Sequence, residues 1–255
     1  MNKSNIFIYL FFMLAFTVFS CDKTDSLQPR GDAAIGASIK AMHLSPDAPV
    51  FNILVDSTKT VGVLATNSIE SGLVFGNIFP SLSGGYAFVP GGAHKVSAKV
   101  PASSTTLPGQ TITSKQFTFE QGKFYSVAIV DSLSRLEAVI VEDNLNIPDT
   151  SKSYFRIANF MLNGTADVSI TSSTIPGYSF QKNGIGYKSV SNFDTLSAGT
   201  YKILLRANGS ATRLDSITAF APANGRKYTL YTRGVVGQTG STNTKRPLIF
   251  QMTNY

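Results

Sequence analysis

The sequence has no tryptophan, only two histidines and a single cysteine among its 255 residues. One cysteine cannot form an intramolecular disulfide, and His43 and His94 do not make a pair at metal-ligand spacing. Hydrolase elbows, nucleotide-binding loops and EF-hand loops are also missing. The sequence therefore predicts no catalytic residue, no metal site and no cofactor, with loop carboxylates such as Asp47 and Asp167 as the remaining candidates for calcium.

Charged residues are few, at 15% of the chain against roughly 25% in average soluble domains. The 22 basic and 15 acidic residues give a net charge of +7, but no run of five basic residues occurs. A nucleic-acid interface concentrates its basic residues in a patch or stripe, so we expect no nucleic-acid partner. The scattered positive charge favours a neighbouring anionic surface of lipid or polysaccharide.

The one long apolar run covers residues 6–19. As a helix it would span about 21 Å, short of the ~30 Å hydrocarbon core of a bilayer. Lys3 precedes the run and Ser20 follows it, which is the arrangement of a secretory signal peptide. We predict a signal peptide at 1–20; a buried helix of the mature fold, the alternative, would need apolar partners on every side.

The single cysteine, Cys21, directly follows that segment. Residues 18–21 (VFSC) resemble a bacterial lipobox, whose cysteine is acylated and becomes the new N-terminus, with Phe19 where a small residue is usual. The resemblance implies lipidation of Cys21 and a lipid anchor in the cell envelope, at the outer membrane or cell surface. Residues 21–37 are rich in Asp, Ser, Gly, Pro and Ala, so we expect a flexible tether.

From Ile39 onward, short apolar runs alternate with turn residues every 8 to 12 positions. This spacing predicts β-sandwiches, and no segment has the period of an amphipathic helix. The strands expected in the first half are 39–44, 50–55, 61–65, 73–79, 93–100, 111–119, 123–130 and 136–141.

The second half repeats the first. Residues 86–100 align without a gap to 193–207, and 122–127 align to 225–230. With one deletion, 39–55 align to 155–170, so that Lys40 corresponds to Arg156, His43 to Asn159 and Asn52 to Asp167. We predict an all-β chain with two tandem immunoglobulin-like antiparallel β-sandwich domains, at 38–145 and 154–255, joined by a polar linker at 146–153.

The same residues carry a family resemblance. "HLSPDAPVFNILVDS" (43–57), "YAFVPGGAHKV" (86–96) and "FTFEQGKFYSVAIV" (117–130) are similar to the domain-of-unknown-function 4397 family. The second copy keeps Arg156, Asn159 and Asp167 but lacks the Ser-Pro-Asp-x-Pro stretch. Over residues 38–255 the resemblance implies a secreted or surface lipoprotein of β-sandwich type, and it implies no activity.

The densest motif is the stretch from His43 to Pro49. We interpret it as a rigid corner between strands, because Pro46 fixes φ and Asp47 accepts hydrogen bonds within its own turn. The motif residues are His43, Ser45, Pro46, Asp47 and Pro49, with Asn159 and Asp167 in the second copy. The rival interpretation makes Asp47 and His43 an acid–base or metal pair, and His94 is expected to be an ordinary strand residue.

Two further patterns bear on glycans. Tyr178, Tyr187, Tyr228 and Tyr231 are candidates for stacking on sugars, against the alternative of sheet packing. Six of the eleven aspartates precede Ser or Thr. This resembles an Asp–Ser/Thr–aliphatic O-glycosylation pattern with candidate acceptors Ser26, Ser132, Thr195 and Ser216, although local Asp and Ser/Thr turns are the favoured explanation.

The sequence predicts a non-catalytic lipoprotein of the cell envelope that acts as a binding or scaffolding module. Its expected partners are the membrane, through the lipid anchor, and an unidentified envelope protein or glycan. The alternatives are an envelope hydrolase with a carboxylate site around Asp47 or Asp167, and a purely structural surface spacer.

Overall fold

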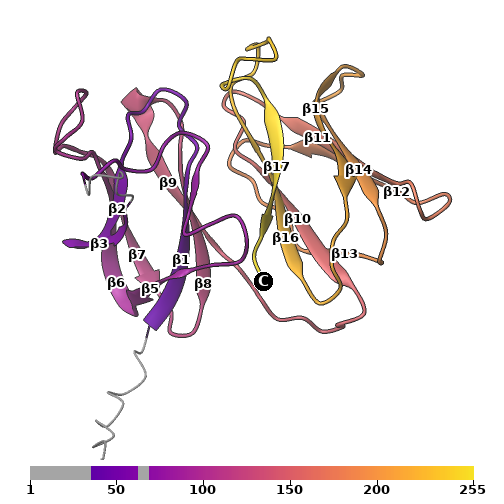
Figure 1. Cartoon of the computed structure of the whole chain (residues 1–255), viewed down its shortest axis with the longest axis horizontal. Helices are drawn as coiled ribbons and strands as arrows, with labels where there is room; N and C mark the ends of the chain where they lie inside the picture. The colour runs from indigo at the N-terminus through magenta and orange to yellow at the C-terminus, as the bar shows by residue number, and fades with distance from the viewer. Residues whose placement is uncertain (1–35, 63–68) are drawn as a thin grey trace, which may run out of the picture. The chain divides into compact units, whose positions relative to one another are not determined.

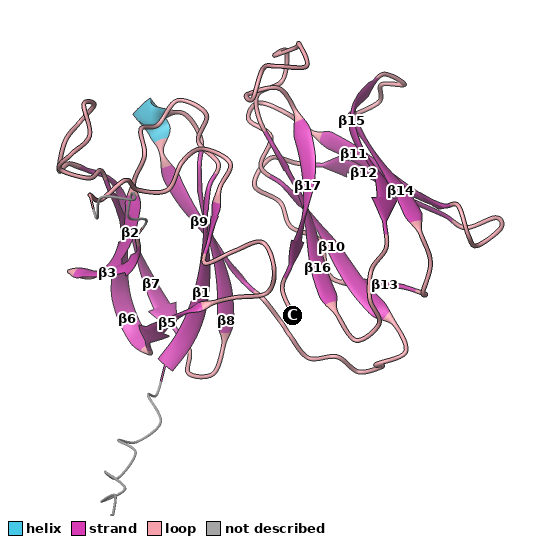
Figure 2. Cartoon of the chain, viewed as in Figure 1, coloured by secondary structure: helices cyan, strands magenta, loops and turns pink. Residues whose placement is uncertain are grey.

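The computed structural model describes residues 36–62 and 69–255 (Figure 1). Within them the chain is almost all β, and the only helix is a three-residue 3-10 turn, η1 (Leu133–Arg135) (Figure 2). This confirms the all-β prediction. The predicted signal peptide, Cys21, Ser26 and nearly all of the tether lie outside the described residues. No described helix has the length and apolar character needed to cross a membrane.

The first half of the chain forms two sheets. One has the strand order β4-β1-β8-β9, with β5 also paired to β1, and the other has the order β3-β2-β6-β7. The strands are β1 (Gly36–His43), β2 (Asn52–Val55), β3 (Thr58–Val61), β4 (Ile78–Phe79), β5 (Ala87–Pro90), β6 (Gly92–Lys99), β7 (Thr111–Phe119), β8 (Phe124–Val130) and β9 (Glu137–Glu142).

The second half forms two further sheets, in the orders β13-β10-β16-β17 and β12-β11-β14-β15. Figure 1 shows the two sheets of this half facing each other as a sandwich. The strands are β10 (Ser153–Asn159), β11 (Ala166–Ser172), β12 (Ser179–Ile185), β13 (Asp194–Leu196), β14 (Tyr201–Ala207), β15 (Arg213–Phe220), β16 (Lys227–Arg233) and β17 (Leu248–Thr253).

The two halves share their strand pairing. β1 pairs in parallel with β8, and β10 pairs in parallel with β16, while the other pairings between named strands of the described residues are antiparallel. Lys40 lies opposite Ser126 and Arg156 lies opposite Thr229. The register therefore agrees with the sequence alignment of Lys40 with Arg156. The domain limits at 145 and 154 stay a prediction, because Ile35–Tyr255 form one compact unit.

Each half has its own apolar core between its two sheets, because alternate strand residues point inward. The first core is built around Phe51, Phe119 and Tyr125, and the second around Phe155, Tyr201 and Phe220. A third buried cluster joins residues of both halves: Met42, Leu44, Ala128, Val130, Ala158, Phe160, Tyr231 and Met252.

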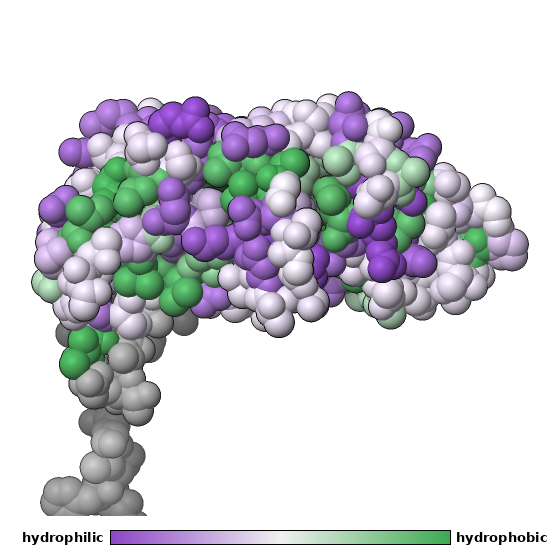
Figure 3. All heavy atoms as spheres, turned by 90° about the horizontal axis from the view of Figure 1, so that it is seen from above, coloured by the Kyte–Doolittle hydropathy of each residue, from purple (hydrophilic) through white to green (hydrophobic). Residues whose placement is uncertain are grey.

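On the face of the molecule drawn in Figure 3, the hydrophobic surface residues form separate patches among hydrophilic ones. The exposed large hydrophobic side chains include Phe88 and Val74, each 50% exposed. Such scattered exposure is common on protein surfaces and does not by itself mark a binding site.

One expected strand is largely a turn. Only Ile78–Phe79 of the predicted strand 73–79 form β4, because Gly76 adopts a φ of 88° and Asn77 N donates to Val74 O at 2.9 Å. The predicted strand 61–65 is observed as Thr58–Val61, and residues 63–65 lie outside the described part. β5 was not expected from the sequence, since it has four residues and ends in Pro90.

Candidate functional site

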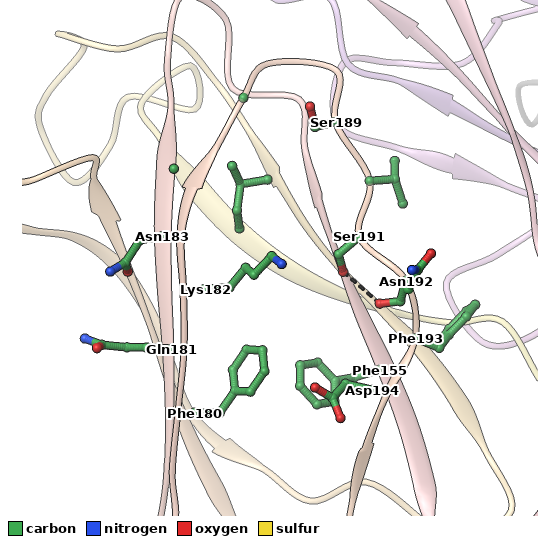
Figure 4. Close-up of a pocket in the computed structure, with 14 residues that line it drawn as sticks. Phe155, Phe180, Gln181, Lys182, Asn183, Ser189, Ser191, Asn192, Phe193 and Asp194 are labelled. Carbon is green, nitrogen blue, oxygen red and sulfur yellow. Dashed lines mark hydrogen bonds between the residues drawn. The ribbon is translucent and has the colours of Figure 1, made fainter.

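A groove of about 600 Å³ lies beside β12 in the second half (Figure 4). Phe155 of β10 and Phe180 of β12 form its apolar base. Their ring centroids are 5.1 Å apart in an edge-to-face arrangement, which is a favoured geometry for aromatic pairs. Phe155 is 1% exposed, so the groove reaches down to the second core.

The groove exists because two sheet edges meet there. β12 pairs only with β11 and β13 pairs only with β10, so each is the edge strand of a different sheet. The segment between them, residues 186–193, crosses from one sheet to the other. It is held against β10 by hydrogen bonds from Ser191 N to Ile157 O (2.8 Å) and from Asn159 N to Ser189 O (2.9 Å). The sandwich is therefore open along this side.

The rim of the groove is polar. Figure 4 shows the Lys182 side chain extending into the groove, while Gln181 and Asn183 point away from it. The exposed Lys182 side chain makes no hydrogen bond or ion pair with another residue among 36–62 and 69–255. Asn192 and the single carboxylate of the lining, Asp194, complete the rim. Apolar walls with a few directed polar groups are typical of ligand sites, and a lone carboxylate does not make an acid–base pair.

His43 lies at the end of β1 and is fully buried. Its ring stacks on Phe51 with centroids 4.2 Å apart, and its Nε2 donates to the Pro49 carbonyl at 3.1 Å. Burial lowers the pKa of the imidazole to about 4, against the opposing effect of the Pro49 hydrogen bond. His43 is therefore uncharged at neutral pH and is occupied in holding the corner.

Asp47 is exposed, and the structure does not bring its carboxylate to His43. Its Oδ1 accepts hydrogen bonds from Leu133 N, at 2.8 Å, and from Ser45 Oγ, at 3.4 Å. The motif thus connects the corner after β1 with the turn η1. Within the described residues, no group of three or more His, Cys, Asp or Glu side chains lies in a position to hold a metal ion.

The second-half counterparts are likewise bonded within the protein. Asn159 Nδ2 donates to the carbonyls of Gly164 (2.9 Å) and Ile185 (2.7 Å). Its Oδ1 accepts from Met161 N (3.0 Å) and Thr232 Oγ1 (2.6 Å). All hydrogen-bonding groups of this fully buried amide are occupied, so Asn159 organises the loops around it.

Asp167, on β11, connects the end of β12 with the turn between β14 and β15. Its Oδ1 accepts from Gly184 N (2.8 Å) and Asn208 Nδ2 (2.9 Å), and its Oδ2 accepts from Gly209 N (2.8 Å). Burial alone would raise the pKa of this carboxyl, but the hydrogen bonds from Asn208, Gly184 and Gly209 outweigh that effect and lower the pKa. The hydrogen bonds therefore stabilise the charged carboxylate form of Asp167.

His94 has a partner that the sequence did not indicate. Its Nδ1 lies 2.7 Å from Asp56 Oδ2, and Asp56 Oδ1 accepts from Lys95 N at 2.9 Å. The hydrogen bond with Asp56 raises the pKa of His94. The Lys95 backbone bond, followed by the His94 bond, lowers the pKa of Asp56. This pair joins the turn after β2 to the neighbouring strand β6.

The candidate tyrosines do not line the groove. Tyr228 and Tyr231 are 8% and 1% exposed and pack in the interior, as the packing interpretation expects. Tyr178 is half-buried with its ring centroid 5.3 Å from that of Tyr201. The aromatic base of the groove is instead Phe155 and Phe180. Only the edge position of Phe180 distinguishes it from other strand residues, and that position depends on topology.

The candidate glycan acceptors lie in different settings. Thr195 is exposed in β13, while Ser132 and Ser216 are half-buried. Asp131 and Asp194 each accept a hydrogen bond from the following backbone N, at 2.8 and 2.7 Å, which is the local turn contact favoured above. Ser216 lies within strand β15. Glycosylation of these residues stays a prediction.

Sequence reasoning also missed a buried polar seam between the halves, which centres on Asp143. Arg156 Nη2 donates to Asp143 Oδ1, and Arg156 Nε donates to Thr229 Oγ1 at 3.0 Å. Tyr86 Oη and Ser126 Oγ each donate to Asp143 Oδ2 at 2.7 Å. These bonds satisfy a carboxylate that is 1% exposed, so the seam is structural.

Lys40, the counterpart of Arg156, lies in the same seam. It is 0% exposed, and its Nζ donates to Thr253 O at 2.8 Å. Burial lowers the pKa of Lys40 to about 8, and the nearby Asp143 charge opposes that shift. The sequence shows that Lys40 and Arg156 are cations, but strand alternation does not predict that such residues are buried. The seam therefore has no signal in the sequence.

The fold and groove define an all-β protein of β-sandwich type with an open edge. The family described as "Domain of unknown function (DUF4397)" matches residues 37–171, more than half of the chain. The chain therefore belongs to this family. No curated protein matches the chain.

Several solved structures are distantly similar. The Bacillus anthracis TIE protein shares 14% identity at a TM-score of 0.26, with 86% of this chain and 44% of that chain covered. A leucine-rich repeat protein from Bacteroides thetaiotaomicron shares 14% identity at a TM-score of 0.20, with 81% of this chain and 26% of that chain covered. A putative cell adhesion protein from Bacteroides fragilis shares 10% identity at a TM-score of 0.25, with 87% of this chain and 98% of that chain covered. The chain spans less than half the length of the first two proteins.

Proposed function

We propose that the protein is a non-catalytic binding module of the cell envelope, held at the outer membrane or cell surface by lipid on Cys21. The observation that carries this proposal is the groove beside β12, whose aromatic base and polar rim suit a ligand. The ligand is a glycan or a segment of an envelope protein, and its capture would serve adhesion or scaffolding.

The contacts of the candidate acid–base residues favour binding over hydrolysis. Paired carboxylates in glycosidases lie about 5–10 Å apart across the bond that they cleave. In this protein Asp47 is bonded to the turn η1, and Asp167 is bonded to the end of β12 and to the turn after β14. His43 is bonded to Pro49 and stacked on Phe51. Each group is committed to a different structural contact.

The test is a screen of residues 22–255, which include the whole compact unit, against glycan and surface-protein arrays. For each ligand found, Phe180→Ala and Lys182→Glu should weaken binding by about tenfold or more, because one removes apolar contact and the other reverses charge. Phe88→Ala, at an exposed phenylalanine of the first half, is the matched control and should leave affinity unchanged. The proposal would be contradicted if no array ligand bound, or if the ligands found bound both groove variants as tightly as the unchanged protein.

A further inference from the structure

The two halves differ sharply in charge. Residues 36–145 contain 7 basic and 8 acidic residues, whereas residues 153–255 contain 11 basic and 3 acidic residues, a net charge of +8. Part of that excess lies in the seam, where Arg156 pairs with Asp143. Other cations of the second half are exposed on the outer face of the sheet β12-β11-β14-β15, among them Lys202 and Arg213.

That outer face is polar because of strict alternation. Along β14, Tyr201, Ile203 and Leu205 are buried in the core, so Lys202, Leu204 and Arg206 point outward. Ser169 and Thr171 of β11 lie outward in the same way, opposite Gln181 and Ser179 of the edge strand β12. We call this outer surface the basic face.

The basic face is hollowed. A depression of about 400 Å³ is lined by Ser169, Gln181, Asn183 and Arg206, with the hairpin residue Ser210 as part of its wall. Besides the aliphatic Val168, Leu204 and Ala211, the lining contains hydroxyl, amide, guanidinium and carboxylate groups and no aromatic ring. It therefore suits a ligand recognised by hydrogen bonds and charge rather than by stacking.

The cations Lys202 and Arg206 of the basic face make no ion pair in the described chain, although Asp167 lies opposite Arg206 on the neighbouring strand. Arg206 Nη1 donates to a neutral group, Ser169 Oγ, at 2.9 Å. The exposed Lys202 side chain makes no hydrogen bond or ion pair with another residue of the described chain. The one carboxylate of the lining, Asp167, already accepts from Gly184, Asn208 and Gly209. The face thus presents two available cations among hydroxyl and amide groups.

We propose that the basic face binds an acidic polysaccharide, a sugar chain that carries carboxylate or sulfate groups. This inference rests on the proposed binding function and names a ligand class and a second surface for it. Arginine pairs with carboxylate and sulfate through two parallel hydrogen bonds, lysine adds a point charge, and Ser, Gln and Asn bond sugar hydroxyls. Lys182, on the other side of the edge strand β12, offers a third cation to a chain that passes over this edge.

The first half supplies an internal control. In the alignment of 86–100 with 193–207, Lys95 corresponds to Lys202 and Lys99 to Arg206. The outer face of that half also has a hollow, of about 290 Å³, but its lining includes Glu70, which pairs with Lys59 at 2.7 Å. The two faces therefore have cations at matching positions, and the hollow of the first half differs in containing an ion pair.

The experiment measures binding of residues 22–255 to polygalacturonate and chondroitin sulfate, with neutral dextran as the reference, at low and high salt. We expect binding to both acidic polymers, no binding to dextran, and weaker binding at high salt because exposed charges are screened. The double variant Lys202→Glu/Arg206→Gln should lose about tenfold or more in affinity. The matched variant Lys95→Glu/Lys99→Gln should stay within about twofold of the unchanged protein.

Four results would overturn the inference: no binding to either acidic polymer at low salt, equal binding to dextran, equal losses in the two double variants, or binding to phosphatidylglycerol vesicles without binding to the polymers. Lys202→Gln, a change at one exposed residue, repeats the test if the double variant does not fold. Any groove ligand found in the array screen is measured on the same variants. Its unchanged binding would show that the groove function stands even where the acidic-polysaccharide inference fails.

Discussion

The two halves use the same topology but fix the chain after their first strand by different means. In the first half the chain turns through Pro46 and Pro49, and His43 adds one hydrogen bond, to the Pro49 carbonyl. In the second half there is no proline at this turn, and Asn159 makes four hydrogen bonds at the corresponding position. Rigidity that proline supplies covalently in one copy is supplied by side-chain hydrogen bonds in the other.

At these positions the two halves keep the same strand register but use different residue types. His43 lies opposite Ile129 and Asn159 lies opposite Thr232. Both are buried polar side chains that bond the loop after the strand. The chemical difference has a consequence, however, because His43 titrates and Asn159 does not.

The largest expected effect concerns the seam that joins the halves. Asp143→Ala should lower the free energy of unfolding by about 3–5 kcal/mol, because it leaves the buried Arg156 without its partner. Chemical denaturation measures the change. Glu142→Ala, which breaks an exposed pair with Lys123, is the neighbouring control and should cost about 1 kcal/mol or less. Equal losses in the two variants would mean that the seam does not depend on the Asp143 charge.

The next largest effect is expected for His43→Asn, which gives the first half the residue type that the second half has at Asn159. Unfolded His43 takes up a proton near pH 6.5, whereas the folded residue does so near pH 4. The unfolded state therefore binds more protons between these values, and the free energy of unfolding should fall as the pH falls, by about 3 kcal/mol at pH 4. His43→Asn should remove this loss.

Unfolding at several pH values tests that expectation, with His94→Asn as the control. Asp56 raises the pKa of His94, so the contribution of His94 is present below pH 6.5 and is lost as the pH rises through the higher folded value. The two substitutions should therefore change the pH profile in opposite directions. A profile that His43→Asn leaves unaltered would show that the imidazole is not buried in its neutral form.

The smallest effect concerns the motif residue that only the first half has. Asp47→Ala removes a hydrogen bond from Leu133 N at an exposed position and should cost about 1 kcal/mol. Asp149→Ala, which removes a comparable exposed turn contact with Ser151 N, should cost a similar amount. A loss of several kcal/mol at Asp47 alone, measured by denaturation, would give the motif a larger role than a corner.

Much of the fold could be predicted from alternation. The strand at 111–119 has its predicted bounds. The strand predicted at 93–100 is shifted by one residue to Gly92–Lys99, and the one predicted at 123–130 begins one residue later. Each has a buried face and a partner on at least one side, so its pattern is clear. The short β5 and the turn at Gly76 depend on tertiary contacts and backbone conformation that the pattern does not encode.

The groove and the seam could not be predicted in the same way. Phe180 has the pattern of any inward strand residue, and its place beside an opening follows from β12 and β13 being edges of different sheets. Asp143 and Tyr86 are 57 residues apart in the chain and meet only through the fold. The sequence placed Asp47 near His43, whereas the turn directs the carboxylate toward Leu133.

The parallel pairing of β1 with β8 has a mechanical consequence. Six residue pairs, from Ser38–Phe124 to His43–Ile129, align along its length. Their hydrogen bonds run across the strands, so a pull along β1 from its N-terminal end loads all of them in shear at once. A hairpin pulled from its open end instead breaks one bond at a time. We expect this first strand to resist such tension as a clamp rather than to peel away.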